Sequence, residues 1–157
     1  MSIRDRSGAK NLMNGRSFCD TYILLYLYSG ADPVKQKRAT ELYREQAVSG
    51  AILISTQVVQ EFYAAASRKL AIPRPTVRAM TEAVFELPLV IVNPSHIRSA
   101  LDNEVRYRIP FRDGLILAAA EAGGAGVPYT EDFNNGRRSG SVLARNPFGS
   151  SEGIGAN

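Results

Sequence analysis

The chain has 157 residues, 45% of them hydrophobic and 22% charged, which is enough for one globular domain that buries roughly two thirds of its unfolded surface. Its formal net charge of +4 is compatible with a nucleic-acid partner but does not require one. One cysteine and one histidine exclude an internal disulfide and a multi-cysteine zinc site, fit a reducing compartment, and leave oxygen-liganded Mg²⁺ or Mn²⁺ as the metals to expect.

The apolar runs and the two ends of the chain predict a single cytoplasmic domain. No apolar run approaches the roughly 20 residues that span a bilayer, and the N-terminus lacks the apolar core of a signal peptide. Residues 1–16 and 149–157 are polar or glycine-rich, which predicts flexible extensions around a domain at residues 17–148. Met13 is a candidate for the true start, because the sequence from Asn14 leads straight into the first strand.

Short apolar runs alternate with helical segments along the domain. The expected strands are residues 17–20, 51–54, 89–92, 127–129 and 142–144, of which the last is expected to end the sheet. The expected helices are residues 23–28, 33 to about 48, a helix that starts at a cap on Ser55 or Thr56 and ends at Lys69, and residues 76–87, 95–108 and 111–122. This alternation predicts an α/β fold, with a central parallel sheet of about four to five strands and helices on both faces.

The helix at residues 111–122 is predicted to be buried on all sides. Residues 115–120 are all apolar and so cover every direction around the helix axis. Asp113 lies in the first turn of this helix. A carboxylate at the edge of the core is costly unless it is paired, hydrogen-bonded or bound to a metal, although the helix N-terminus partly offsets that cost.

Three further acids lie where they can join Asp113. Asp20 ends the first strand, Glu61 borders the packed face of its helix, and Asp132 follows a later strand. Each has an ordinary explanation, as a helix cap, a solvated helix residue or a turn former. Together they suit Mg²⁺ or Mn²⁺ and phosphodiester hydrolysis, since ligands gather beyond the carboxyl ends of strands. The helical projection that places Glu61 at this border places Gln57 toward solvent.

The stretches around these acids resemble the PIN-domain ribonucleases, and within them the VapC-type toxins of toxin–antitoxin pairs. The matching stretches, in family order, are residues 18–21 (FCDT), 55–63 (STQVVQEFY), 109–116 (IPFRDGLI), 129–133 (YTEDF) and 146–148 (NPF). The resemblance implies a parallel-sheet α/β fold, cleavage of RNA that depends on Mg²⁺ or Mn²⁺, and a homodimer. It also implies a cognate antitoxin whose tail occupies the acidic cleft. Transfer RNA is a candidate substrate.

The resemblance also assigns roles to individual residues. It implies that four acids bind the metal and carry catalysis: Asp20, Glu61, Asp113 and Asp132. It implies supporting roles for Thr21, Thr130 and, less directly, Glu131. Candidates to contact RNA phosphates are Arg112, Arg137 and Arg138, although a solvated loop explains the last two equally well.

Two positions depart from the family pattern. Tyr22 stands where an asparagine is usual, and Arg112 stands where an aromatic residue is usual. Either change is expected to weaken metal binding. This leaves a second hypothesis, a catalytically weakened PIN domain that binds RNA or a protein partner. A phosphatase with Asp20 as nucleophile is disfavoured, because such sites usually need a second acid at the position of Tyr22.

Overall fold

A parallel sheet forms the centre of the protein. The computed structural model describes residues 16–48, 50–129, 138–139 and 142–143. Within these ranges the main sheet has four strands in the order β3-β2-β1-β4. The strands are β1 (Arg16–Cys19), β2 (Ile52–Ser55), β3 (Leu89–Val90) and β4 (Ala125–Tyr129). β1 pairs in parallel with both β2 and β4, and β2 with β3, which confirms the predicted α/β class and parallel sheet.

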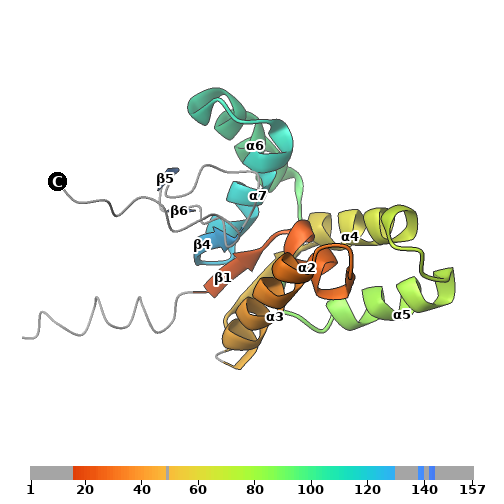
Figure 1. Cartoon of the computed structure of the whole chain (residues 1–157). Coiled ribbons are helices and arrows are strands. Elements are labelled where there is room, and N and C mark those ends of the chain that lie inside the picture. The colour runs from red at the N-terminus through yellow and green to blue at the C-terminus, as the bar shows by residue number, and fades with distance from the viewer. Residues whose placement is uncertain (1–15, 49, 130–137, 140–141, 144–157) are drawn as a thin grey trace, which may run out of the picture.

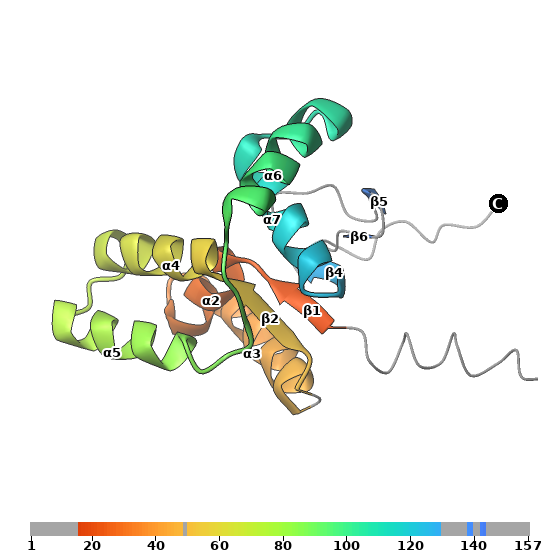
Figure 2. The same cartoon turned by 180° about the vertical axis from the view of Figure 1, so that it is seen from behind.

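Helices cover both faces of this sheet, as predicted. They are α2 (Thr21–Tyr28), α3 (Pro33–Val48), α4 (Thr56–Lys69), α5 (Arg74–Val84), α6 (Pro94–Tyr107) and α7 (Phe111–Ala122). On one face, α3 contacts β2, with α2 between α3 and α4 (Figure 1). On the other face, α7 contacts β2 and β4, and α6 packs on α7, as the reverse view also shows (Figure 2).

Local capping chemistry explains why several helices begin where the sequence predicts. Asp32 precedes Pro33 at the start of α3, and its Oδ1 accepts a hydrogen bond from the Lys35 backbone N–H at 3.0 Å. Ser55 caps α4, where its Oγ accepts from the Val58 N–H at 3.4 Å. α7 has the predicted bounds.

α5 begins two residues and ends three residues earlier than predicted. It spans Arg74–Val84 rather than residues 76–87. Pro75 does not delay the start, because proline is tolerated in the first turn of a helix. Pro88 disfavours the helical conformation at Leu87, so the helix ends before it.

β3 is two residues shorter than predicted, and α6 begins one residue earlier. The backbone N–H of Val92 donates to Thr56 Oγ1 at 3.1 Å, which ties the chain to the start of α4. Asn93 and His96 then form a reciprocal capping box, with distances of 3.1 and 3.2 Å, that fixes the start of α6.

The prediction that residues 142–144 end the main sheet is wrong for the two residues that the structure describes. Val142–Leu143 is β6, and it pairs in an antiparallel direction with β5 (Arg138–Ser139) in a separate two-stranded sheet. Two short strands separated by two residues pair most readily with each other, as in a hairpin, whereas parallel pairing requires a long crossover. Residue 144 lies outside the described residues.

The packing of α7 confirms that it is a buried helix. Its residues from Asp113 to Ala120 are all buried. Gly114 allows α6 and α7 to approach closely, because a Cβ at this position would lie 2.7 Å from the Ala100 carbonyl oxygen. Asn103 on α6 adds a hydrogen bond of 3.0 Å to the Gly114 carbonyl oxygen. In the described part of the chain, no helix is long and apolar enough to cross a membrane.

Candidate functional site

Asp20 lies at the carboxyl end of β1, and its side chain is fully buried. It is the N-cap of α2, because its Oδ1 accepts a hydrogen bond from the Thr21 backbone N–H at 2.6 Å. The strand therefore leads directly into a helix that begins at Thr21. The loop and later helix start expected from the sequence are wrong for this reason. The capping role is real, but it uses only part of the carboxylate.

Glu61 lies on α4, and its side chain is 31% exposed. Its Oε2 accepts a hydrogen bond from Thr21 Oγ1 at 2.9 Å, and its Oε1 accepts one from Gln57 Nε2 at 3.2 Å. The start of α2 and the first turns of α4 thus fix this carboxylate beside Asp20. Thr21 contacts an acid of the cluster directly.

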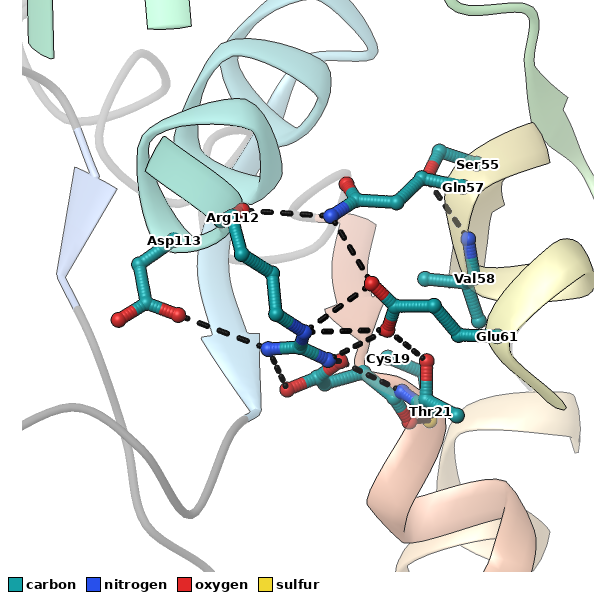
Figure 3. Close-up of polar contacts among 9 residues, drawn as sticks. Cys19, Thr21, Ser55, Gln57, Val58, Glu61, Arg112 and Asp113 are labelled. Atoms are coloured by element: carbon teal, nitrogen blue, oxygen red, sulfur yellow. Dashed lines mark hydrogen bonds and ion pairs between the residues drawn. The ribbon is translucent and has the colours of Figure 1, made fainter. Parts of the chain in front are cut away.

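Arg112 lies at the centre of the acids (Figure 3). Its Nη2 is 2.8 Å from Asp20 Oδ1 and 2.6 Å from Glu61 Oε2, and its Nε is 3.0 and 3.1 Å from the two Glu61 oxygens. Its Nη1 is 3.5 Å from Asp113 Oδ1. One guanidinium therefore bridges carboxylates from the end of β1, from α4 and from α7.

The charge of Arg112 is secured by these partners. Burial by itself lowers the pKa of the guanidinium. The negative charge of Asp20 and the hydrogen bonds that the guanidinium donates to Glu61 and Asp20 raise the pKa, and the net direction is upward. Arg112 therefore remains a permanent cation between the acids.

Tyr22 and Arg112, the two departures from the family pattern, contact each other. The guanidinium carbon of Arg112 lies 5.6 Å from the centre of the Tyr22 ring, and Lys69 Nζ lies 5.6 Å from the same ring. Both distances are within the range of cation–π interactions. Tyr22 thus forms a wall of the site on the side of Arg112.

Gln57 belongs to the site, which the sequence pattern did not predict. It was expected toward solvent, but only 9% of the residue is exposed. Its Nε2 donates to Glu61 and, at 3.3 Å, to the Arg112 carbonyl oxygen at the start of α7. The helical projection could not include α7, which covers this part of α4. The spacing of four residues between Gln57 and Glu61, which makes them neighbours on one side of a helix, is the sequence signal that could have placed Gln57 in the site.

A cavity of about 200 Å³ adjoins the acids. Thr21, Tyr22, Glu61 and Arg112 line it together with Arg68 and Lys69 at the end of α4, among other residues. A negative cluster therefore lies beside a cavity that carries positive charges. That combination suits a ligand with phosphate groups more than an apolar ligand.

The carboxylate set fits a hard divalent cation by its chemistry. Asp20, Glu61 and Asp113 supply the oxygen ligands that Mg²⁺ and Mn²⁺ prefer. In the described part of the chain, however, no group of three or more acidic, histidine or cysteine side chains is arranged to hold a metal ion. The guanidinium of Arg112 lies between the carboxylates instead, within 2.6 to 3.5 Å of their oxygens (Figure 3).

Several predicted site residues are not described by the structure. Thr130, Glu131, Asp132 and Arg137 lie outside the described residues, and only the backbone of Arg138, in β5, lies within them. Of the four predicted metal-binding acids, the structure thus brings together Asp20, Glu61 and Asp113.

Comparison with known proteins defines the class of this fold. The family model for the PIN domain matches residues 17–134, which is well over half of the chain, and the chain therefore belongs to the PIN-domain family.

Among solved structures, the chain is similar to VapC20 of Mycobacterium tuberculosis, described as a toxin that cleaves the sarcin–ricin loop. The TM-score is 0.62 at 17% sequence identity, over 74% of this chain and 89% of that chain. At this identity the similarity establishes a shared fold. None of the curated proteins matches the chain significantly.

Proposed function

We propose that this protein is a metal-dependent endoribonuclease and the toxin of a type II toxin–antitoxin pair. The observation that carries the proposal is the convergence of Asp20, Glu61 and Asp113, from three separate elements, at the carboxyl edge of a PIN-domain sheet. The similarity of the fold to a VapC toxin supports the same conclusion.

In this proposal, the site residues have two roles in hydrolysis, metal binding and support of the metal-binding acids. Asp20, Glu61 and Asp113, with Asp132 as a fourth acid, would hold Mg²⁺ or Mn²⁺, which would neutralise negative charge on the phosphoryl group and lower the pKa of a bound water. The Thr21 hydroxyl fixes the orientation of Glu61. Thr130 and Glu131 are the further supporting residues of this proposal.

The single cysteine, Cys19, is not a competing nucleophile. Burial, and secondarily the charge of Asp20, raise the pKa of the Cys19 thiol, so this residue stays neutral. A neutral, buried thiol is a poor nucleophile. In the proposed reaction the attacking group is a water molecule.

The cavity beside the acids binds the RNA backbone. Arg137 and Arg138, with Arg112, contact phosphates. Substrates to test are transfer RNA and the ribosomal sarcin–ricin loop, the RNA that VapC20 cleaves. The protein acts as a homodimer in the cytoplasm, where a cognate antitoxin covers the acidic cleft.

A second candidate function is a binding module without catalysis. One observation favours it: Arg112 already neutralises part of the charge of the three acids. In that case the positively charged side of the cavity would bind RNA or an acidic protein segment and no bond would be cut.

Cleavage of purified transfer RNA and ribosomal RNA separates the two candidates. The wild-type protein, free of antitoxin, is incubated with Mg²⁺ or Mn²⁺ and in parallel with EDTA. The Asp113→Asn variant is compared with Asp102→Asn, a matched change at an exposed acid on α6.

The endoribonuclease proposal predicts cutting in the wild type and Asp102→Asn, and none in Asp113→Asn or with EDTA. Attack by water also predicts fragments with linear phosphate ends and no 2′,3′-cyclic phosphates. Equal cutting by Asp113→Asn would refute the site. Binding of RNA without any cutting would establish the second candidate.

A further inference from the structure

The two oxygens of Glu61 are already fully engaged. They accept hydrogen bonds from the Thr21 hydroxyl, from the Gln57 amide and from both Nε and Nη2 of Arg112. A carboxylate offers about four acceptor positions. A divalent cation could therefore bind Glu61 only if some of these donors left.

Arg112 is the donor that can leave. Gln57 is nearly buried, and its amide also donates to the Arg112 carbonyl oxygen. Thr21 is buried in the first turn of α2. Thr21 and Arg112 both line the cavity of about 200 Å³, but the side chain of Arg112, in contrast to buried Thr21, is 29% exposed. The guanidinium thus has open space beside it, which the amide of Gln57 lacks.

Arg112 also occupies the position that matters most for a cation. Its nitrogen atoms lie 2.6 to 3.5 Å from oxygen atoms of Asp20, Glu61 and Asp113. A metal ion within reach of the same oxygens would lie close to the guanidinium, which is also positively charged. The repulsion between the two cations would weaken the binding of each to the carboxylates.

We infer that Arg112 is an internal competitor of the divalent cation. In the metal-free protein it holds the three carboxylates together, and metal binding requires the guanidinium to move out of the cluster. Tyr22 flanks the guanidinium on the side of the cavity. Both departures from the family pattern, Tyr22 and Arg112, therefore lie at the place where the guanidinium and the metal ion compete.

The inference rests on the proposed function in one respect, the use of a divalent cation by these acids. It is tested by measuring Mn²⁺ binding with isothermal titration calorimetry in the absence of RNA. If the protein fails to cut RNA, the Mn²⁺ titration can still be carried out and interpreted. If the titration contradicts the role of Arg112, the cleavage test of the proposed function is unaffected.

The titration compares the wild type with Arg112→Gln and Arg68→Gln. Arg68 lines the same cavity and is exposed, and its Nε donates at 3.3 Å to a backbone carbonyl oxygen of its own helix. Its removal thus controls for the general loss of one positive charge. The expected result is Mn²⁺ affinity at least about tenfold higher in Arg112→Gln, and within about twofold of the wild type in Arg68→Gln. Affinity in Arg112→Gln equal to or below that of the wild type would overturn the inference.

Loss of Arg112 leaves two buried carboxylates without their cation, so the variant needs a check of folding. In EDTA, the melting temperature of Arg112→Gln is expected to be lower than that of the wild type. On addition of Mn²⁺ it is expected to rise by more than that of the wild type. An equal rise in both proteins would count against the inference.

A measurement on the unaltered protein covers the case in which Arg112→Gln does not fold. Solvent exchange of the Arg112 Nε–H is followed by NMR in the wild type. This proton is expected to exchange slowly without metal and rapidly with saturating Mg²⁺. Exchange that stays slow while amide signals near Glu61 and Asp113 report bound Mg²⁺ would overturn the inference, because both cations would then share the site.

Discussion

Asp20 and Glu61 contact the same guanidinium from two regions that differ in burial. Asp20, at the end of β1, is fully buried and also caps α2. Glu61, on α4, has a side chain that is 31% exposed, and it is fixed by side chains from its neighbours. The difference indicates that the carboxylate of Asp20 contributes to folding as well as to the site, whereas that of Glu61 contributes mainly to the site.

The largest effect is expected for Asp20→Ala. This change removes the N-cap of α2 and takes from Arg112 its fully buried partner, so the free energy of unfolding is expected to fall by about 3 to 5 kcal/mol. Urea denaturation followed by circular dichroism measures it. Asp20→Asn, which keeps a good cap, is the control and is expected to lose less. A loss below about 1 kcal/mol in Asp20→Ala would remove the contrast with Glu61.

A smaller effect is expected for Gly114→Ala, next to the third acid. The added methyl group would meet the Ala100 carbonyl oxygen at 2.7 Å, so α6 and α7 must separate, at a cost of about 1 to 3 kcal/mol. Gly30→Ala is the matched control, because no atom lies within 4 Å of a Cβ built there. Thermal melts of the two variants compare the costs, and equal stability would show that the contact between α6 and α7 is not tight.

Cys19 tests the burial of the β1 region through pH. Burial first, and then the charge of Asp20, raise the pKa of its thiol above that of the unfolded chain. The stabilisation is therefore fully present below about pH 8.5, the pKa of a free cysteine, and is lost as the pH rises toward the folded pKa.

Between pH 8.5 and 9.5 the wild type is expected to lose about 1 kcal/mol of unfolding free energy more than Cys19→Ala does. Urea titrations of both proteins at the two pH values provide the comparison. Parallel losses in the two proteins would show that the thiol ionises in the folded state and that this end of β1 is less enclosed than its burial indicates.

The smallest effect on stability is expected for Glu61→Gln. A partly exposed ion pair contributes about 0 to 1 kcal/mol, and glutamine keeps the size of the side chain. Urea denaturation should place this variant within about 1 kcal/mol of the wild type. A loss as large as that of Asp20→Ala would contradict the division of roles between the two acids.

Much of the fold could be predicted because its signals are local. Pro33 behind Asp32, the cap at Ser55 and the apolar run of α7 each define an element within a few residues. The resemblance to the PIN-domain family also predicted that Asp20, Glu61 and Asp113 share one site. Their role in metal binding is a proposal.

The centre of the site could not be predicted, because it depends on contacts between distant segments. Arg112 reaches Asp20 across 92 positions of sequence and Glu61 across 51. A residue pattern identifies Arg112 as unusual but does not say where its guanidinium lies. Gln57 was misplaced for the same reason, since the helix that buries it comes more than 50 positions later.

The most direct test of the account is the cleavage rate of Glu61→Gln under single-turnover conditions, at a temperature where it and the wild type are both folded. The account predicts near-normal stability with a rate lower by about 100-fold or more, because a carboxylate that acts in the reaction is lost without loss of the fold. A rate within about threefold of the wild type would show that the acids around Arg112 are a structural ion-pair cluster and not the catalytic site.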